Sequence, residues 1–392
     1  MTSSRLISLD IARGLAIFVM VFAEISEIVS MYSVVMIGDV HLLSLFLPGP
    51  MLLMVSGASL FYWFRHIEKS GNGTKRAWTR TLVLLAFQGM IGMTWWSLKE
   101  FLAWELIAAL GLTTILLWYL RHVKVPYLFV AGLAIILLAP VIQILFDTPA
   151  YWREPYGFDG LPAHTGLAED HPLLAVTALI ATGYYPVFPH FGFSLIGYAF
   201  GWWIQSDSKI TLRQVQIFCA AAFVSGAGLL SFNNLASLDI WWLGYRHFPM
   251  TLPASLLYLG SNLFIMSAVL KYFDRDKHNM GILSRSLYTM GQNALYIYLL
   301  ALMVPALAVK LGGFFYLMPG FSLEYLATFP HYWSSLPLWG QFYGNLLPVP
   351  AALFVGLLFN IAMIKIFSKP RYKPNESLDA GKSRRLFGLI RL

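Results

Sequence analysis

The sequence predicts an all-α, polytopic membrane protein: a bundle of about ten transmembrane helices with both termini in the cytoplasm. Its composition is the first reason, because 58% of the residues are hydrophobic, 12% are charged and the mean hydropathy is +0.65, whereas about 25% of a soluble domain is charged. The second reason is that apolar stretches long enough to cross about 30 Å of hydrocarbon recur along the whole chain. We therefore expect a multi-pass protein in the lipid bilayer of the cell (inner or plasma) membrane.

Ten apolar stretches are the expected spans. They are 14–37, 42–64, 81–98, 101–120, 126–146, 186–204, 214–232, 250–271, 286–310 and 346–368. Segment 172–185 is too short to cross alone and is followed by Pro186 and Pro189, so we expect an outer-face or re-entrant helix there, which would be an eleventh. We expect residues 1–368 to form a single transmembrane domain and the basic residues 369–392 to form a flexible cytoplasmic tail.

The placement of basic residues predicts the orientation. With ten spans, the outer connections hold only Lys99, Arg153, Arg246 and Lys310, so 27 − 4 = 23 of the Lys and Arg residues lie at the N-terminus, on the even connections or in the tail. Because Lys and Arg concentrate on the cytoplasmic side of membrane proteins, both termini are expected there. The net charge of +8 is then a result of orientation, and we expect no nucleic-acid partner.

Two acidic residues lie inside the first expected span. Glu24 and Glu27 come about 15 and 20 Å beyond Gly14 at 1.5 Å of rise per residue, which places Glu24 near mid-membrane and both residues on one helix face. Carboxylates in a membrane segment are costly and face the bundle interior or a wet cavity. Asp10 and Arg13, three residues apart at the membrane boundary, share a helix face and can neutralise each other.

Glycines in one expected span and a cluster of histidine and acidic residues in the outer loop allow other roles. Gly192, Gly197 and Gly201 predict a close helix approach, since the last two have the GxxxG spacing. A possible metal cluster in the outer loop would consist of His164, Glu169, Asp170 and His171. Their spacing fits no established zinc pattern, so we expect no metal.

Five motifs follow one another along the chain. They are RLISLDIARGLAIFVMVF (5–22), PGPMLLMVSGASL (48–60), YYPVFPHFGFSLIGYAFGWW (184–203), RHFP (246–249) and MGQNALYIY (290–298). This ordered set resembles the membrane acyltransferases related to heparan-α-glucosaminide N-acetyltransferase, in a prokaryotic-type form without a soluble domain. The chain departs from the family pattern at Glu24, where Asn or His is common, at Ala301, where a histidine is common, and in the closer spacing of His41 to the second motif.

The resemblance implies acyl transfer across the membrane. Such enzymes take an acyl group from acyl-CoA (acetyl-CoA) on the cytoplasmic side and pass it to a hydroxyl or amine on the outer side. The implied partners are the donor and an extracytoplasmic small-molecule or glycan acceptor, sugar-like in character. No permanently bound cofactor is implied, and a homodimer is one assembly that the sequence allows.

The expected catalytic residues are His41, Glu24 and Glu27. The resemblance implicates a histidine near the outer end of the first two spans, where His41 ends the connection GDVH. An imidazole of pKa about 6.5 suits a base or a nucleophile, and Asp39 or Glu27 could orient it. A buried carboxyl with a raised pKa could itself be the base. The plain alternatives are an interfacial histidine and protonated carboxyls that hydrogen-bond other helices.

Substrate contacts are expected at both mouths of the cavity. Arg13, with Asp10, would anchor the CoA phosphates, unless the pair only fixes the first span against its neighbours. The acceptor side has His190, Arg246 and His247, with aromatic-belt packing as the alternative. Asn293 is either a ligand contact or a helix–helix hydrogen bond. A cytoplasmic basic run consists of Lys69, Lys75, Arg76 and Arg80; it could meet CoA or anionic lipid, although the orientation alone explains it.

Two rival functions stay open. The first is a small-solute transporter or channel, in which the carboxylates of the first span would couple protons. The second is a catalytically inactive family member, which Glu24 and Ala301 favour. An enzyme would release free CoA from acyl-CoA, whereas a transporter would move its solute unchanged.

Overall fold

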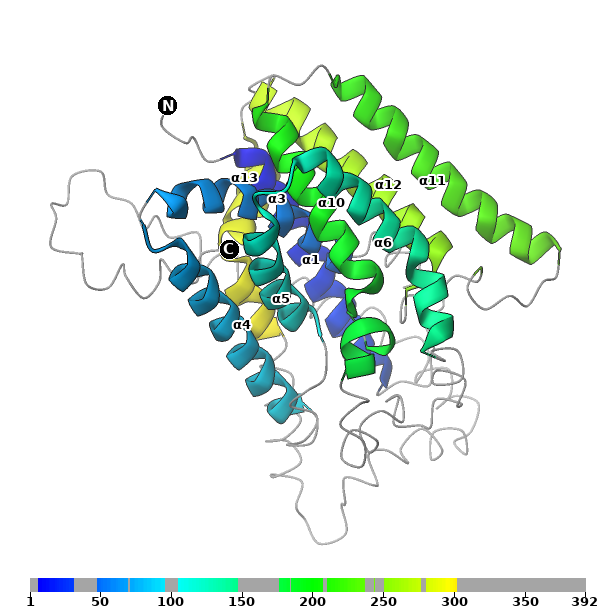
Figure 1. Cartoon of the computed structure of the whole chain (residues 1–392), viewed down its shortest axis with the longest axis horizontal. Helices are drawn as coiled ribbons and strands as arrows, with labels where there is room; N and C mark the ends of the chain where they lie inside the picture. The colour runs from blue at the N-terminus through cyan, green and yellow to red at the C-terminus, as the bar shows by residue number, and fades with distance from the viewer. Residues whose placement is uncertain are drawn as a thin grey trace, which may run out of the picture.

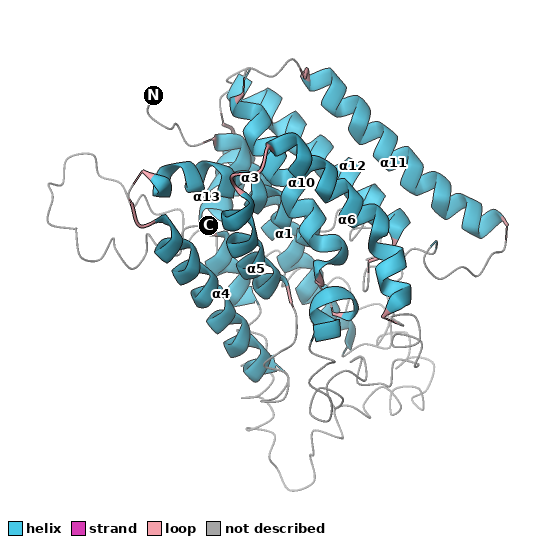
Figure 2. Cartoon of the chain, viewed as in Figure 1, coloured by secondary structure: helices cyan, strands magenta, loops and turns pink. Residues whose placement is uncertain are grey.

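The computed structural model describes residues 6–31, 48–69, 71–95, 105–146, 176–183, 185–206, 210–236, 243, 250–275 and 280–301. All the elements identified within these ranges are helices, as Figures 1 and 2 show. They are α1 (Ile7–Met31), α3 (Pro48–Glu68), α4 (Gly73–Trp95), α5 (Leu106–Leu120), α6 (Val125–Leu145), η3 (Ala178–Thr182), α10 (Val187–Gln205), α11 (Leu212–Leu235), α12 (Leu252–Val269), η5 (Leu270–Arg275) and α13 (Ile282–Gln292), with a further helical stretch at 294–301.

Three of the described helices are long and apolar enough to cross a membrane. They are Val125–Leu145, Leu212–Asn233 and Leu252–Asp274. The expected total of ten spans stays a prediction, and the last expected span (346–368) and the tail lie outside the described residues. Two helices begin well before the expected spans, since α1 starts at Ile7 and α4 at Gly73. Hydropathy marks the part of a helix that lies in hydrocarbon, whereas backbone hydrogen bonding continues into the polar boundary.

Several helix ends meet at one end of the bundle. They belong to the connections that the sequence predicts to be cytoplasmic. The Arg121 Nε of the α5–α6 connection donates to Glu68 Oε1 at the end of α3 over 2.6 Å, and Trp118 Nε1 of α5 donates to Thr74 Oγ1 of α4 over 3.2 Å. Arg65 of α3 likewise donates to Gln205 at the end of α10. We call this the basic end: the end at which α1 and α4 begin and α3 and α10 finish.

Close helix crossings form the centre of the bundle. A Cβ atom at Gly197 would lie 2.0 Å from the Met54 carbonyl oxygen, and one at Gly201 would lie 2.6 Å from that of Ala58. The GxxxG prediction is therefore confirmed, with α3 as the partner of α10. Figure 1 shows α4 and α11 at opposite edges of the molecule, with α3 and α10 between them.

Candidate functional site

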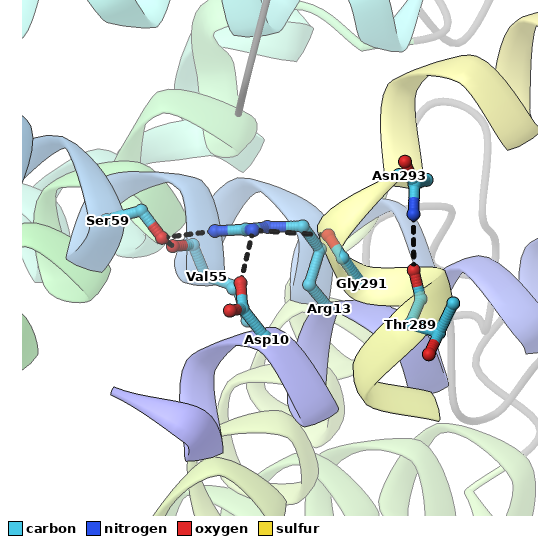
Figure 3. Close-up of polar contacts among 7 residues, drawn as sticks. All are labelled: Asp10, Arg13, Val55, Ser59, Thr289, Gly291 and Asn293. Carbon is cyan, nitrogen blue, oxygen red and sulfur yellow. Dashed lines mark hydrogen bonds and ion pairs between the residues drawn. The ribbon is translucent and has the colours of Figure 1, made fainter. Parts of the chain in front are cut away.

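Arg13 is the centre of a buried polar cluster at the basic end. Its side chain lies in the second turn of α1, and both Arg13 and Asp10 are buried, at 5% and 2% exposure. Arg13 Nη1 donates to Asp10 Oδ1 at 2.9 Å and to the Gly291 carbonyl at 3.3 Å. Its Nη2 donates to Ser59 Oγ, which in turn donates to the Val55 carbonyl at 2.7 Å. One guanidinium thus joins α1, α3 and α13 (Figure 3).

Two glycines allow this contact. A Cβ atom at Gly291 would lie 1.7 Å from the Asp10 carbonyl oxygen, and one at Gly14 would lie 1.8 Å from that of Leu287. A larger residue at either position would push α1 and α13 apart. Because α13 ends at Gln292, the Gly291 carbonyl is one of those left without an intrahelical partner, and a cation suits that helix end.

The first turn of α1 is held from a distant part of the chain. The backbone N–H groups of Ile7 and Ser8 donate to the two carboxylate oxygens of Asp274 at 3.2 and 3.1 Å. These are helix-terminal donors that α1 cannot satisfy itself, and a carboxylate complements the positive end of the helix dipole. Asp274, in η5, therefore fixes the position of the first turn of α1, which carries Asp10 and directly precedes the turn with Arg13.

A small cavity lies beside Arg13. Its volume is about 20 Å³, and α1, α3, α5 and the stretch 294–301 all line it, with Ile17, Ser56 and Tyr298 among the lining residues. That volume holds about one water molecule. The Ser56 hydroxyl on its wall is buried and has no hydrogen-bond partner in the described part of the chain. The site is thus narrow, polar at Arg13 and apolar towards Ile17.

The expected catalytic residues are only partly covered by the structure. Residues 24 and 27 lie on α1, whose backbone is described there, while their side chains are outside the described set. His41, Arg246 and His247 lie outside the described residues altogether.

Asn293 marks a break between α13 and the helical stretch 294–301. Its backbone has left the helical conformation, and its Nδ2 donates to the Thr289 carbonyl at 2.8 Å (Figure 3). The hydrogen bond seen for this side chain therefore stays within its own helix, rather than crossing to another as the helix–helix alternative expected.

His190 lies at the start of α10, at the end of the bundle opposite Arg13. Its ring is buried, at 1% exposure, and its Nδ1 is 3.1 Å from the Pro186 carbonyl oxygen. A carbonyl only accepts hydrogen bonds, so Nδ1 carries the proton and Nε2 has a free lone pair. Nε2 is buried without a partner among the described residues. The Tyr185 ring packs edge-on against His190, with centroids 5.0 Å apart.

Arg80 is a buried cation that the sequence pattern did not separate from its exposed neighbours. Lys75 and Arg76 are exposed, whereas Arg80 is buried, at 7% exposure. Its guanidinium lies 5.0 Å from the centroid of the Trp63 ring. A usable signal was present, since Ala77, Leu84 and other buried residues of α4 recur at helical spacing, and Arg80 falls on the same face.

Comparison with protein families identifies one match. The family model described as "Heparan-alpha-glucosaminide N-acetyltransferase, catalytic" matches residues 5–233, which is more than half of the chain. A comparison with curated proteins found no match. The matched region contains Asp10, Arg13, Arg80 and His190 but ends before α12, so the motif resemblances at 246–249 and 290–298 lie beyond it.

Proposed function

The chain belongs to the heparan-alpha-glucosaminide N-acetyltransferase catalytic family, a family of membrane acetyltransferases, and from this membership we propose that it is an acyl-CoA-dependent membrane acyltransferase. It takes an acetyl group from acetyl-CoA on the cytoplasmic side and passes it to a hydroxyl or amine of an extracytoplasmic, sugar-like acceptor. The match over residues 5–233 is the observation that carries this proposal.

The contacts of Arg13 favour a positioning role over a phosphate anchor. Its two terminal nitrogens already donate to Asp10, Ser59 and the Gly291 carbonyl. A phosphate would have to displace those groups, and Asp10 would repel it. We therefore assign the Asp10–Arg13 pair to holding α1 against α3 and α13, the alternative that the sequence left open.

The acyl path is proposed to follow the Arg13 face of α1. Ile17, one turn further on, lines the same cavity. Glu24 and Glu27 follow Arg13 by eleven and fourteen residues, close to three and four turns, so helical geometry places these positions on the same face. A donor that enters from the basic end would meet both carboxyl positions along one line.

The chemistry requires a proton acceptor for the incoming group. The acceptor's oxygen or nitrogen attacks the thioester carbonyl carbon and loses its proton to a base. The tetrahedral intermediate then expels the CoA thiolate, which is protonated as free CoA. We assign the role of base or nucleophile to His41, with Glu24 or Glu27 as the orienting group or as the base in its place.

Acceptor recognition is proposed for the opposite end of the bundle. The free Nε2 of His190 supports a role as hydrogen-bond acceptor for a substrate hydroxyl or amine. Arg246 and His247 belong to the same outer side in the predicted topology and are further candidates for binding the acceptor. Asn293 is proposed as a contact on the path between the two ends.

The test is release of free CoA by the full chain in proteoliposomes. The protein is given radiolabelled acetyl-CoA on one side and a panel of amino sugars and simple sugars on the other, with empty liposomes as the control. Acetylated acceptor and free thiol should appear together in equal amounts. His41→Ala should lower turnover by about 100-fold or more and leave acetyl-CoA binding intact, whereas Glu24→Gln should do so if the carboxyl is the base.

The opposite outcomes are equally clear. If both variants keep full activity, the catalytic assignment is wrong. If the protein never releases CoA but moves an unmodified sugar across the bilayer, the transporter alternative replaces acyl transfer.

A further inference from the structure

We propose that Arg80 is the receptor for a phosphate ester group, bound at the basic end of the bundle between α3 and α4. The observation behind this proposal is a buried cation that has no anionic partner among the described residues. Arg80 is 93% buried, and its Nε makes no hydrogen bond to any described residue. In the described part of the chain Arg80 forms no ion pair, and its guanidinium packs against the Trp63 ring.

The side chains around Arg80 leave its N–H groups available to bind an anion. The Trp63 ring supports one face of the guanidinium at 5.0 Å, which leaves the edge, with its N–H groups, for a ligand. Ser59 and Trp63 are four residues apart on α3, so they share a face about 6 Å apart. Arg13 binds Ser59 and Arg80 stacks on Trp63, so the two guanidinium groups flank the same face about one turn apart.

The net charge of the buried groups around Arg80 also favours binding of an anion. Asp10 neutralises Arg13 at 2.9 Å, which leaves the group of Asp10, Arg13 and Arg80 with a charge of −1 + 1 + 1 = +1. A buried charge without a partner is strongly unfavourable. A phosphate ester would satisfy it, because its oxygens match the fork of a guanidinium and form charge-assisted hydrogen bonds.

Two neighbouring cations lie in solvent close to Arg80. Lys75 and Arg76 are exposed on α4 within about two turns of Arg80, on the side towards the start of the helix. Arg76 precedes Arg80 by four residues and carries the same group in water, so it provides a matched control.

Two sources could supply the phosphate ester. One is CoA, and this part of the inference rests on the proposed function. The other is the headgroup of an anionic lipid, and this part does not. The chemistry recognised by Arg80 is the same in both cases.

The experiment compares Arg80→Gln with Arg76→Gln in the full-length protein. Binding of CoA is measured by calorimetry in nanodiscs of phosphatidylcholine, which present no anionic lipid. Retention of phosphatidylglycerol is measured by native mass spectrometry after exposure to vesicles that contain it. We expect Arg80→Gln to weaken the binding of one of the two ligands by about 10-fold or more. Arg76→Gln should change the binding of either ligand by less than about twofold.

Each outcome has a defined meaning. Loss of CoA affinity assigns the site to the donor, and loss of retained phosphatidylglycerol alone assigns it to lipid. If the Arg80→Gln protein melts cooperatively and binds both ligands as tightly as the wild type, the proposal is overturned. If Arg80→Gln does not fold, Arg80→Lys decides: a loss of about threefold or more relative to Arg76→Lys supports the site, and equal binding overturns it. A wild-type protein that does not bind CoA refutes the proposed function, while the lipid measurement still decides the Arg80 site.

Discussion

Arg13 and His190 differ in how their polar atoms are used. Arg13 donates to a carboxylate, a hydroxyl and a backbone carbonyl, so its hydrogen-bonding capacity serves the fold. His190 uses one ring nitrogen on the Pro186 carbonyl and leaves the other free among the described residues. A polar atom that is buried and unpaired has an energetic cost, and a bound water, ion or substrate is one explanation for it.

The Asp10–Arg13 pair gives a stability prediction. Arg13→Met should destabilise the protein by about 3–5 kcal/mol, because Asp10 is left as a buried charge without a partner. The double variant Asp10→Leu with Arg13→Met should recover part of that loss, since no charge is then stranded. Thermal unfolding of the four proteins of the cycle, purified in one detergent, measures the coupling.

The more exposed pair of Glu68 and Arg121 is the control for this cycle. Its carboxylate side chain is 41% exposed, so Glu68→Gln should cost at most about 1 kcal/mol. Purely additive effects of the Asp10 and Arg13 changes would show that the buried pair is not coupled.

For His190, the prediction separates its two nitrogens. Asn places an amide nitrogen near the Nδ1 position, whereas Gln can place a carbonyl oxygen near Nε2. If Nε2 accepts a hydrogen bond from the acceptor, His190→Gln should keep more activity than His190→Asn, and the KM for the acceptor should rise by about 10-fold in the Asn variant. Steady-state kinetics at saturating acetyl-CoA provides the measurement. Equal kcat/KM for both variants would remove His190 from the acceptor site.

At the scale of helices, periodicity and small-residue spacing predicted more than composition could. The GxxxG pair at Gly197 and Gly201 identified a crossing face correctly, although it could not say that α3 is the partner. The sequence could not reveal the capping of α1 by Asp274, because the two are 267 residues apart. Nor did it separate Arg80 from the basic run, since the positive-inside rule accounts for every cation in that run without distinguishing buried from exposed.

The α3–α10 crossing gives a prediction for glycine. Gly197→Ala should destabilise the protein by about 1–3 kcal/mol, because its Cβ would lie 2.0 Å from the Met54 carbonyl oxygen and the helices would have to separate. Gly228→Ala in α11 meets nothing within 4 Å and should be neutral or stabilising by up to about 1 kcal/mol, as alanine favours helix. The difference in melting temperature between the two variants is the readout. A Gly197→Ala protein as stable as Gly228→Ala would refute the close approach.

For the whole molecule, the meeting of helix ends agrees with the charge pattern. The α3–α4 and α5–α6 connections and the end of α10 lie at the basic end, as alternating spans require. Which face of the membrane this end occupies follows from the distribution of Lys and Arg and remains a prediction.

Cysteine labelling tests that orientation. In a protein that lacks Cys219, a single cysteine at position 160 should react with an impermeant maleimide in intact cells. One at position 72, between α3 and α4, should react only after permeabilisation. The reverse pattern would place the basic end outside the cell and reverse the direction of acyl transfer.

Asp274 and Gly291 have a consequence for how the molecule is assembled. Both lie beyond residue 233, where the family match ends, yet one holds the first turn of α1 and the other accepts a hydrogen bond from Arg13. A fragment that ends at residue 233 would keep α1 packed on α3, but it would lose the carboxylate that caps the first amides of α1 and one partner of Arg13. The matched region is therefore not a self-sufficient unit. During synthesis, α1 can settle into its final place only after Asp274 and Gly291 have left the ribosome, so this early helix is locked late.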